Sequence, residues 1–133
     1  MPQKYYNLFL DDDPKRIPHQ LKWIDLPPVQ WTRAKDYDKF VALIEANGLP
    51  NIVSFDHDLS DAAYKEYFRV REHGGPINYA NIPEKTGLDC ARWLANYCVD
   101  KRLPLPIYYV HTLNGPGAAN IFSVMESARK VIA

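Results

Sequence analysis

The stretch NIVSFDHDLSD, residues 51–61, decides how this chain of 133 residues folds. It begins with the short, mostly apolar run 51–55 and passes directly into Asp56, His57 and Asp58. A short apolar run that ends abruptly in polar residues is typical of a strand buried in a parallel sheet. We therefore predict a strand over residues 51–55, with acidic residues at its carboxyl end.

The same pattern occurs near the start of the chain and again near its end. Residues 5–10, YYNLFL, lead into three aspartates, and residues 107–110, IYYV, lead into His111. Both runs are predicted strands for the same reason. Residues 29–34, VQWTRA, are a plausible further strand.

Helical signals separate these strands. The predicted helices cover residues 36–47, 62–71, 86–101 and 118–132, with a short helical piece at 19–24. Thr86 is the expected N-cap of the third long helix, and Asp89 would complete a capping box. The stretch from about residue 60 to 85 is polar and aromatic and contains glycine and proline. We expect it to be an insertion of helix and long loop, of the kind that often serves as a lid.

Strands that alternate with helices indicate an α/β protein with a parallel sheet and helices on its faces. Right-handed crossovers then favour a small doubly wound sheet of about four strands in the order 2-1-3-4. At 133 residues the chain has the usual length of one domain, so residues 1–133 are expected to form a single unit.

The charge balance excludes some classes of partner. Lysine and arginine together number 16, as do aspartate and glutamate. A neutral chain has no long-range attraction for long duplex nucleic acid or anionic membranes. No segment approaches the roughly 18 apolar residues needed to cross a bilayer, and the first residues do not resemble a secretory signal. We expect a cytoplasmic protein, present as a monomer or a small homo-oligomer.

The polar residues that follow the strands form the candidate site. In open parallel sheets, ligands bind outside the carboxyl ends of the strands. That edge is expected to bring together Asp11, Asp12, Asp56, Asp58 and His111. Crowded carboxylates repel one another unless a cation lies among them, and such oxygen ligands suit Mg²⁺ or Mn²⁺. Helix capping or a solvated turn explains either acidic cluster alone, but their meeting on adjacent strands indicates a metal- and phosphate-handling site.

Histidines supply the expected proton-transfer groups. His111 and His57 can donate or accept a proton near neutral pH, although a lone histidine is as readily a packing residue. Thr112, Asn114 and a turn that contains Gly117 follow the first of these. Backbone amides of such a turn, entering a helix, can cradle an anion.

Aromatic residues of the insertion are candidates for contact with a nucleobase, because stacking needs exposed rings near the site. They are Tyr64, Tyr67, Phe68 and Tyr79.

Three ordered motifs, LFLDDDP, NIVSFDHDL and TGLDCARWL, resemble those of bacterial receiver domains of two-component signalling. The resemblance implies that Asp11, Asp12 and Asp56 hold Mg²⁺, with the backbone carbonyl at Asp58 joining them. It also implies a flavodoxin-like fold. This chain departs from that family because it lacks a fifth strand ending in lysine, and His111 closes the fourth.

A closer resemblance is to the cyclic-phosphate processing receiver-like domain. The motifs here are LDD at 10–12, WTRA at 31–34, SFDHDL at 54–59, TG at 86–87 and HTLN at 111–114. Thr112 stands where that family has serine. The family's arginine after LDD has no clear counterpart, because Pro14 and Lys15 precede Arg16, so Arg33 is the better candidate for a phosphate ligand.

This second resemblance implies a metal-assisted phosphoesterase that acts on a cyclic or terminal phosphate of a nucleotide or an RNA end. Asp11, Asp12, Asp56 and Asp58 would hold the metal, and His111 or His57 would move the proton. Asp56 could instead attack the phosphorus directly. The residues expected to orient the phosphate are Arg33, Thr112, Asn114 and Gly117.

Two other functions stay open on the sequence alone. The same candidate site could bind a nucleotide or cyclic nucleotide without cleaving it. A degenerate receiver domain could also serve for protein docking through its aromatic insertion.

Overall fold

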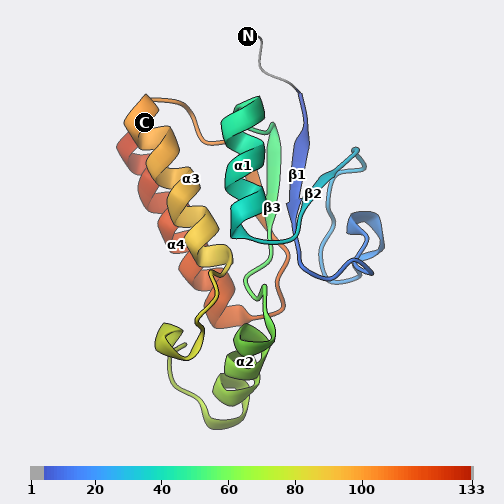
Figure 1. Ribbon diagram of the computed structural model, residues 1–133, viewed down its shortest axis with the longest axis vertical. Helices are drawn as coiled ribbons and strands as arrows, with labels where there is room; N and C mark the ends of the chain where they lie inside the picture. The colour runs from blue at the N-terminus through green and yellow to red at the C-terminus, as the bar shows by residue number, and fades with distance from the viewer. Residues whose placement is uncertain (1–4, 133) are drawn as a thin grey trace.

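The computed structural model describes residues 5–132 and confirms the predicted α/β fold with its parallel sheet. Four parallel strands, β1 (Asn7–Leu10), β2 (Thr32–Ala34), β3 (Ile52–Phe55) and β4 (Ile107–Val110), lie in the order β2-β1-β3-β4. Figure 1 shows β2, β1 and β3 side by side. This is a receiver- and flavodoxin-like arrangement, and the sheet formed by the described residues has no fifth strand. β2 is shorter than predicted because Val29 donates its amide to Pro27 in a tight turn before the strand begins.

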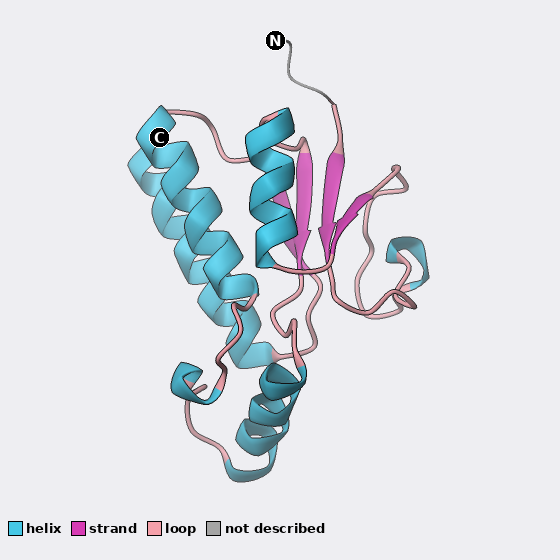
Figure 2. Cartoon of the chain, in the orientation of Figure 1, coloured by secondary structure: helices cyan, strands magenta, loops and turns pink. Residues whose placement is uncertain are grey.

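Four α-helices accompany the sheet (Figure 2). They are α1 (Tyr37–Asn47), α2 (Asp61–His73), α3 (Gly87–Lys101) and α4 (Gly115–Ile132). Two short 3-10 helices, η1 (Pro18–Gln20) and η2 (Tyr79–Asn81), lie in the connections. η1 replaces the short helix predicted over residues 19–24.

Polar side chains fix where three of these helices begin. Asp36 accepts from the amide of Lys39 at the start of α1, and Ser60 accepts from Ala63 at the start of α2. Thr86 and Asp89 form the predicted capping box of α3. Each cap satisfies backbone amides that have no partner inside the helix.

α4 begins three residues earlier than predicted. Its first residues are Gly115, Pro116 and Gly117, which are usually turn formers. Proline is tolerated in the first turn of a helix, where its missing amide would have had no partner. The amide of Ala118 donates to the carbonyl of Asn114 and closes this first turn.

The main core lies on one face of the sheet. Alternate strand residues Leu8, Leu10, Val53 and Phe55 are fully buried there. Helices α1, α3 and α4 contribute Phe40, Ile44, Leu94, Cys98, Ile121 and Met125 to the same cluster. Because side chains alternate along a strand, Phe9 and Ser54 point to the other face, and so do the next alternate residues, Asp11 and Asp56.

The stretch predicted as an insertion folds as α2, a glycine turn and η2. Figure 1 shows α2 beyond the carboxyl ends of the strands. Glu66 stabilises this stretch, because its carboxylate accepts hydrogen bonds from the side chain of Arg69, the amide of Asn78 and the side chain of Asn81. Gly74, which ends α2, has a φ of +78°, a conformation that favours glycine.

Within residues 5–132, none of the helices combines the length and apolar character that a bilayer span requires.

Candidate active site

The register of the sheet sets three residues at one level. Leu10 pairs with Ala34 and Phe55, and Phe55 pairs with Val110. The residue after each strand continues the hydrogen-bond ladder: Asp11 donates its amide to Ala34, Asp56 to Leu10 and His111 to Phe55. Asp11, Asp56 and His111 therefore stand side by side at the carboxyl ends of β1, β3 and β4.

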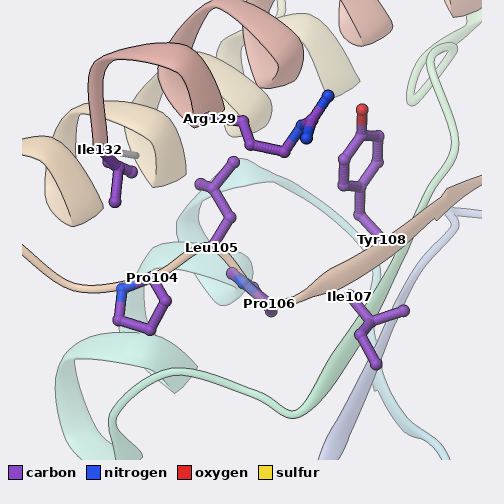
Figure 3. A pocket seen from close by; sticks show the side chains of 7 residues that line it. All are labelled: Pro104, Leu105, Pro106, Ile107, Tyr108, Arg129 and Ile132. Carbon is purple, nitrogen blue, oxygen red and sulfur yellow. The ribbon is translucent and has the colours of Figure 1, made fainter.

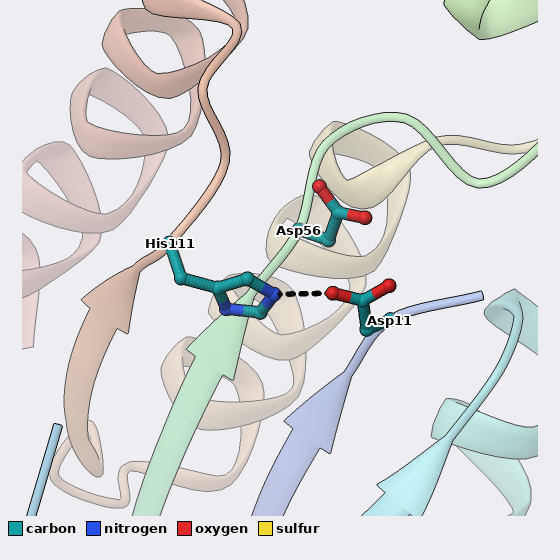
Figure 4. Close-up of side chains that lie close together, drawn as sticks. All are labelled: Asp11, Asp56 and His111. Carbon is teal, nitrogen blue, oxygen red and sulfur yellow. Dashed lines mark hydrogen bonds and ion pairs between the residues drawn. The ribbon is translucent and has the colours of Figure 1, made fainter. Parts of the chain in front are cut away.

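Their side chains meet in a buried group. Nε2 of His111 lies 3.0 Å from Oδ2 of Asp11, and one potential ligand atom from each of the three residues lies within 4.8 Å of the others (Figure 4). All three residues are at most 1% exposed. The group could hold a metal ion. It unites two of the predicted metal ligands with the histidine that was predicted for proton transfer.

Neighbouring groups fix the ring of His111. Its Nδ1 lies 2.7 Å from Oγ of Ser54, and its face stacks on Phe9 with ring centroids 4.4 Å apart. Trp23 donates to the backbone carbonyl of His111. An ionised Asp11 can only accept a hydrogen bond, so Nε2 carries the proton and the Ser54 hydroxyl donates to Nδ1.

The three titratable groups respond differently to burial. Burial lowers the pKa of His111, which opposes the effect of the Asp11 charge. Burial alone would raise the pKa of Asp11, but the hydrogen bond from His111 and further charges bring it below its ordinary value. Burial raises the pKa of Asp56 well above its ordinary value, and the nearby Asp11 charge adds to this. The group thus contains a neutral imidazole, an ionised acid and an acid that holds its proton more readily.

Arg16 supplies a cation at the same point. Its Nη1 lies 3.5 Å from Oδ2 of Asp11 and 3.4 Å from Oδ2 of Asp56. The guanidinium therefore bridges two of the candidate metal ligands. Although the sequence did not favour Arg16 as a phosphate ligand, this residue lies at the centre of the site.

Arg33, the arginine favoured from the sequence, lies outside the acidic group. Its guanidinium stacks over Phe9, 5.0 Å from the ring centroid, and donates to the backbone carbonyls of Asp13 and Arg16. These contacts hold the loop that carries Arg16. A direct phosphate contact of Arg33 stays a prediction.

Asp12 is not part of the buried group of Asp11, Asp56 and His111. Its Oδ1 accepts from the hydroxyl of Tyr64 on α2 at 3.1 Å, and burial raises the pKa of its carboxyl. The contact links the loop after β1 to the insertion.

His57 and Asp58 form a second buried network. Nδ1 of His57 lies 2.7 Å from Oδ1 of Asp58, which also accepts from the side chain of Asn114 at 3.1 Å. Nε2 of His57 lies 2.9 Å from the hydroxyl of Tyr79, to which Asn120 donates. The backbone amide of His57 donates to Oδ1 of Asp56 at 2.9 Å, but both ring nitrogens are engaged by these other residues, so the imidazole does not join the group of Asp11, Asp56 and His111.

Two glycines permit this close packing. An added Cβ at Gly117 would lie 2.5 Å from Cγ of His57, and one at Gly87 would lie 1.8 Å from the carbonyl oxygen of Asp56. The amide of Gly117, predicted to cradle an anion, donates to Oδ1 of Asn114. Both glycines are needed because helices α3 and α4 begin directly against the residues that follow β3.

A cavity of about 250 Å³ opens beside the group. It is lined by Arg16, Asp56, Asp58, Tyr64, Tyr67, Phe68, Arg71, Thr112, Leu113 and Asn114. Two arginines, carboxylates and a hydroxyl thus face the same space as aromatic rings of α2. Of the four aromatic residues proposed for base contact, three line this cavity, and Tyr79 belongs to the His57 network.

A larger cavity, about 430 Å³, lies at the amino end of β4 and the last turns of α4 (Figure 3). Its lining of Pro104, Leu105, Pro106, Ile107, Tyr108, Arg129 and Ile132 contains no acid. This cavity lies at the opposite end of β4 from His111. Its lining includes the cationic side chain of Arg129 but no carboxylate beside it.

Sequence reasoning missed Ser54 and Arg71 and undervalued Arg16. Ser54 belongs to the predicted strand and to the motif SFDHDL, and no role in the site was predicted for it, although strand alternation places it on the same face as Asp56 and Phe9. The position of Arg16 could not be read from spacing, because it depends on how Arg33 holds the loop.

Among known protein families, the cyclic-phosphate processing receiver domain matches residues 6–127. No curated protein and no solved structure matches the chain.

Proposed function

Since the chain belongs to the family of cyclic-phosphate processing receiver domains, and so has a role linked to cyclic-phosphate processing, we propose that it is a metal-assisted phosphoesterase. Its substrate would be a cyclic or terminal phosphate of a nucleotide or an RNA end. One observation carries the proposal: the buried group of Asp11, Asp56 and His111 shares Asp56 with a cavity lined by two arginines and three aromatic rings.

The donor set suits a divalent cation. Two carboxylates and an imidazole within 4.8 Å are ligands that Mn²⁺ accepts, and the carboxylates also suit Mg²⁺. The guanidinium of Arg16 lies within 3.5 Å of both carboxylates, which supports a preference of this point for positive charge. Asp11 and Asp56 would hold the ion, with His111 beside them. When bound, it would neutralise charge on a phosphoryl oxygen and make nearby water more acidic.

Residues of the cavity would orient the phosphate. Arg16 and Arg71 offer guanidinium groups, whose paired donors match phosphate oxygens. The Thr112 hydroxyl accepts from the amide of Asn114 at 3.1 Å, so its own proton is free for a phosphate oxygen. A phosphate held between these groups would lie beside Asp56.

We assign proton transfer to His111 rather than His57, because the ring of His111 contacts Asp11 in the buried group, whereas the ring of His57 contacts Asp58 and Tyr79. Asp11 and Ser54 orient the ring of His111. Asp56 faces both the buried group and the cavity, where it can accept a proton from water or attack the phosphorus. In net terms, water adds to the phosphorus, one P–O ester bond breaks, and the released oxygen takes the proton.

A binding function without cleavage is the second candidate. It is favoured by Arg16, because a guanidinium that compensates Asp11 and Asp56 makes the site complete without a metal ion. In that case the cavity would hold a nucleotide phosphate and leave its ester bonds intact.

Incubation with 2′,3′-cyclic nucleotides and Mn²⁺, followed by ³¹P NMR, tests the proposal. We expect conversion to a nucleotide monophosphate, and none with Asp56→Asn. A panel of cyclic and terminal phosphates recovered unchanged from the metal-loaded protein would contradict it. Calorimetry with the same panel then tests the binding function. Tight binding of a compound that is recovered unchanged would support it.

A further inference from the structure

Arg16 and a divalent ion would need the same two oxygens. Nη1 of Arg16 lies 3.5 Å from Oδ2 of Asp11 and 3.4 Å from Oδ2 of Asp56. An ion bound to both carboxylates would lie roughly 2.0–2.2 Å from an oxygen of each. Two cations so close together repel strongly in a buried site. The guanidinium therefore has to leave when the ion enters.

The structure lets the side chain of Arg16 move while its backbone stays in place. The amide of Arg16 donates to the carbonyl of Asp13, and Arg33 donates to the carbonyl of Arg16. The Arg16 side chain, by contrast, is 27% exposed and lines the cavity. Its Nε lies 3.9 Å from a carboxylate oxygen of Asp13, so it keeps an acidic neighbour after it leaves the buried pair.

We propose that Arg16 and the divalent ion exchange at the Asp11 and Asp56 carboxylates. In the ion-free protein, the positive charge of the guanidinium balances the negative charge of the Asp11 and Asp56 site. The incoming ion displaces it into the cavity, where it meets the phosphate of the substrate. This inference rests on the proposed metal site but not on catalysis.

The exchange couples the ion to the phosphate. A phosphate that binds the displaced Arg16 favours the state in which the ion is bound. By linkage, the ion and the phosphate must then strengthen each other's binding by the same factor. Arg16 would thus prevent the site from holding an ion tightly until a phosphate is present.

Calorimetry with Mn²⁺ alone tests the exchange in wild-type protein, Arg16→Gln and Arg71→Gln. Arg71 is a matched control, because it lines the same cavity and no contact links it to Asp11 or Asp56 in the described structure. We expect Arg16→Gln to bind Mn²⁺ about tenfold more tightly than wild type, since a charge-assisted contact no longer competes. Arg71→Gln should stay within about twofold.

A second titration with Mn²⁺, in the presence of inorganic phosphate, tests the coupling between the ion and the phosphate. At saturating concentration phosphate should tighten Mn²⁺ binding to wild type several-fold and have a much smaller effect on Arg16→Gln. If Arg16→Gln fails to fold, ¹⁵N NMR of wild type tests the same displacement. Addition of Mg²⁺ should then shift the Nε–H resonance of Arg16 and leave that of Arg71 in place.

The outcomes separate this inference from the proposed function. Wild type that binds Mn²⁺ as tightly as Arg16→Gln, or more tightly, overturns the exchange and leaves the metal site standing. Absence of Mn²⁺ binding to all three proteins overturns both the exchange and the metal-assisted mechanism. Tighter binding by Arg16→Gln supports the exchange even if no cyclic phosphate is hydrolysed.

Discussion

Nε2 of His111 lies 3.0 Å from Oδ2 of Asp11, although the two residues are 100 positions apart in the chain. Strand β3 lies between β1 and β4, so the imidazole reaches across the end of the strand that carries Ser54 and is followed by Asp56. A single side chain therefore connects the carboxyl ends of three strands.

Replacement of His111 by glutamine should lower the hydrolysis rate about 10²- to 10⁴-fold, the usual contribution of a positioned acid or base. Initial rates with a 2′,3′-cyclic nucleotide measure this, and circular dichroism checks the fold. His73→Gln is the control, because the His73 side chain is 68% exposed. A rate for His111→Gln within threefold of wild type would remove His111 from the mechanism.

Ser54→Ala should lower activity or Mn²⁺ affinity about 10- to 100-fold while the protein stays folded. The Ser54 hydroxyl is the partner of Nδ1 of His111, and without it the ring loses its preferred tautomer and orientation. Calorimetry and rate measurements on the same preparation show which of the two falls. Unchanged values of both would mean that Asp11 and Phe9 suffice to orient the ring.

Gly117→Ala should destabilise the protein by about 1–3 kcal/mol, the usual cost of overpacking a filled core. The new methyl group would meet the fully buried ring of His57 at 2.5 Å. Gly115→Ala, two residues earlier in α4, has no atom within 4 Å of its added Cβ and should leave stability nearly unchanged. Urea unfolding of the two variants compares them directly, and equal midpoints would contradict the packing described for His57.

The sequence predicted the fold and the edge of the sheet where the site lies, because both follow from local patterns. Apolar runs that end in polar residues indicated three of the strands, and right-handed crossovers between them indicated the strand order. It did not predict that His57 turns away from Asp56. The direction of that ring depends on Gly117 and Tyr79, which approach it only in the folded chain.

The stability supplied by Glu66 should depend on pH. Its hydrogen bonds from Arg69, together with those from Asn78 and Asn81, lower its pKa from 4.5 to about 2. A folded-state pKa below the unfolded one adds stability above pH 4.5, and this is lost as the pH falls toward 2. Glu66→Gln should therefore unfold at lower urea than wild type at pH 7, and the gap should shrink below pH 4.5. A gap that does not change with pH would show that the charge of Glu66 contributes nothing.

Phe68→Ala should raise KM for a nucleotide about tenfold while kcat changes little, because stacking on a base contributes binding and not chemistry. Phe68 is 55% exposed and lines the cavity beside Arg16. Phe122→Ala is the control, since Phe122 is 46% exposed and packs on Tyr108 instead. Equal effects of the two changes, or no effect of the first, would argue against base contact by α2.

The two arginines show a further limit of sequence reasoning. Arg33 was favoured because it lies in the motif WTRA, whereas Arg16 follows a proline and a lysine that break the expected spacing. In the structure Arg33 holds the loop through its backbone carbonyls, and this places Arg16 on the acids. Motif spacing cannot reveal such an indirect role, because it depends on the path of an irregular loop.

Diffraction from crystals grown with Mn²⁺ tests the metal site most directly. We predict one anomalous difference peak within bonding distance of the Asp11 and Asp56 carboxylates and next to His111, with the guanidinium of Arg16 moved away from both carboxylates. A peak bound instead by Asp12 or Asp58, or no peak at saturating Mn²⁺, would contradict the assignment of Asp11 and Asp56 as the metal ligands.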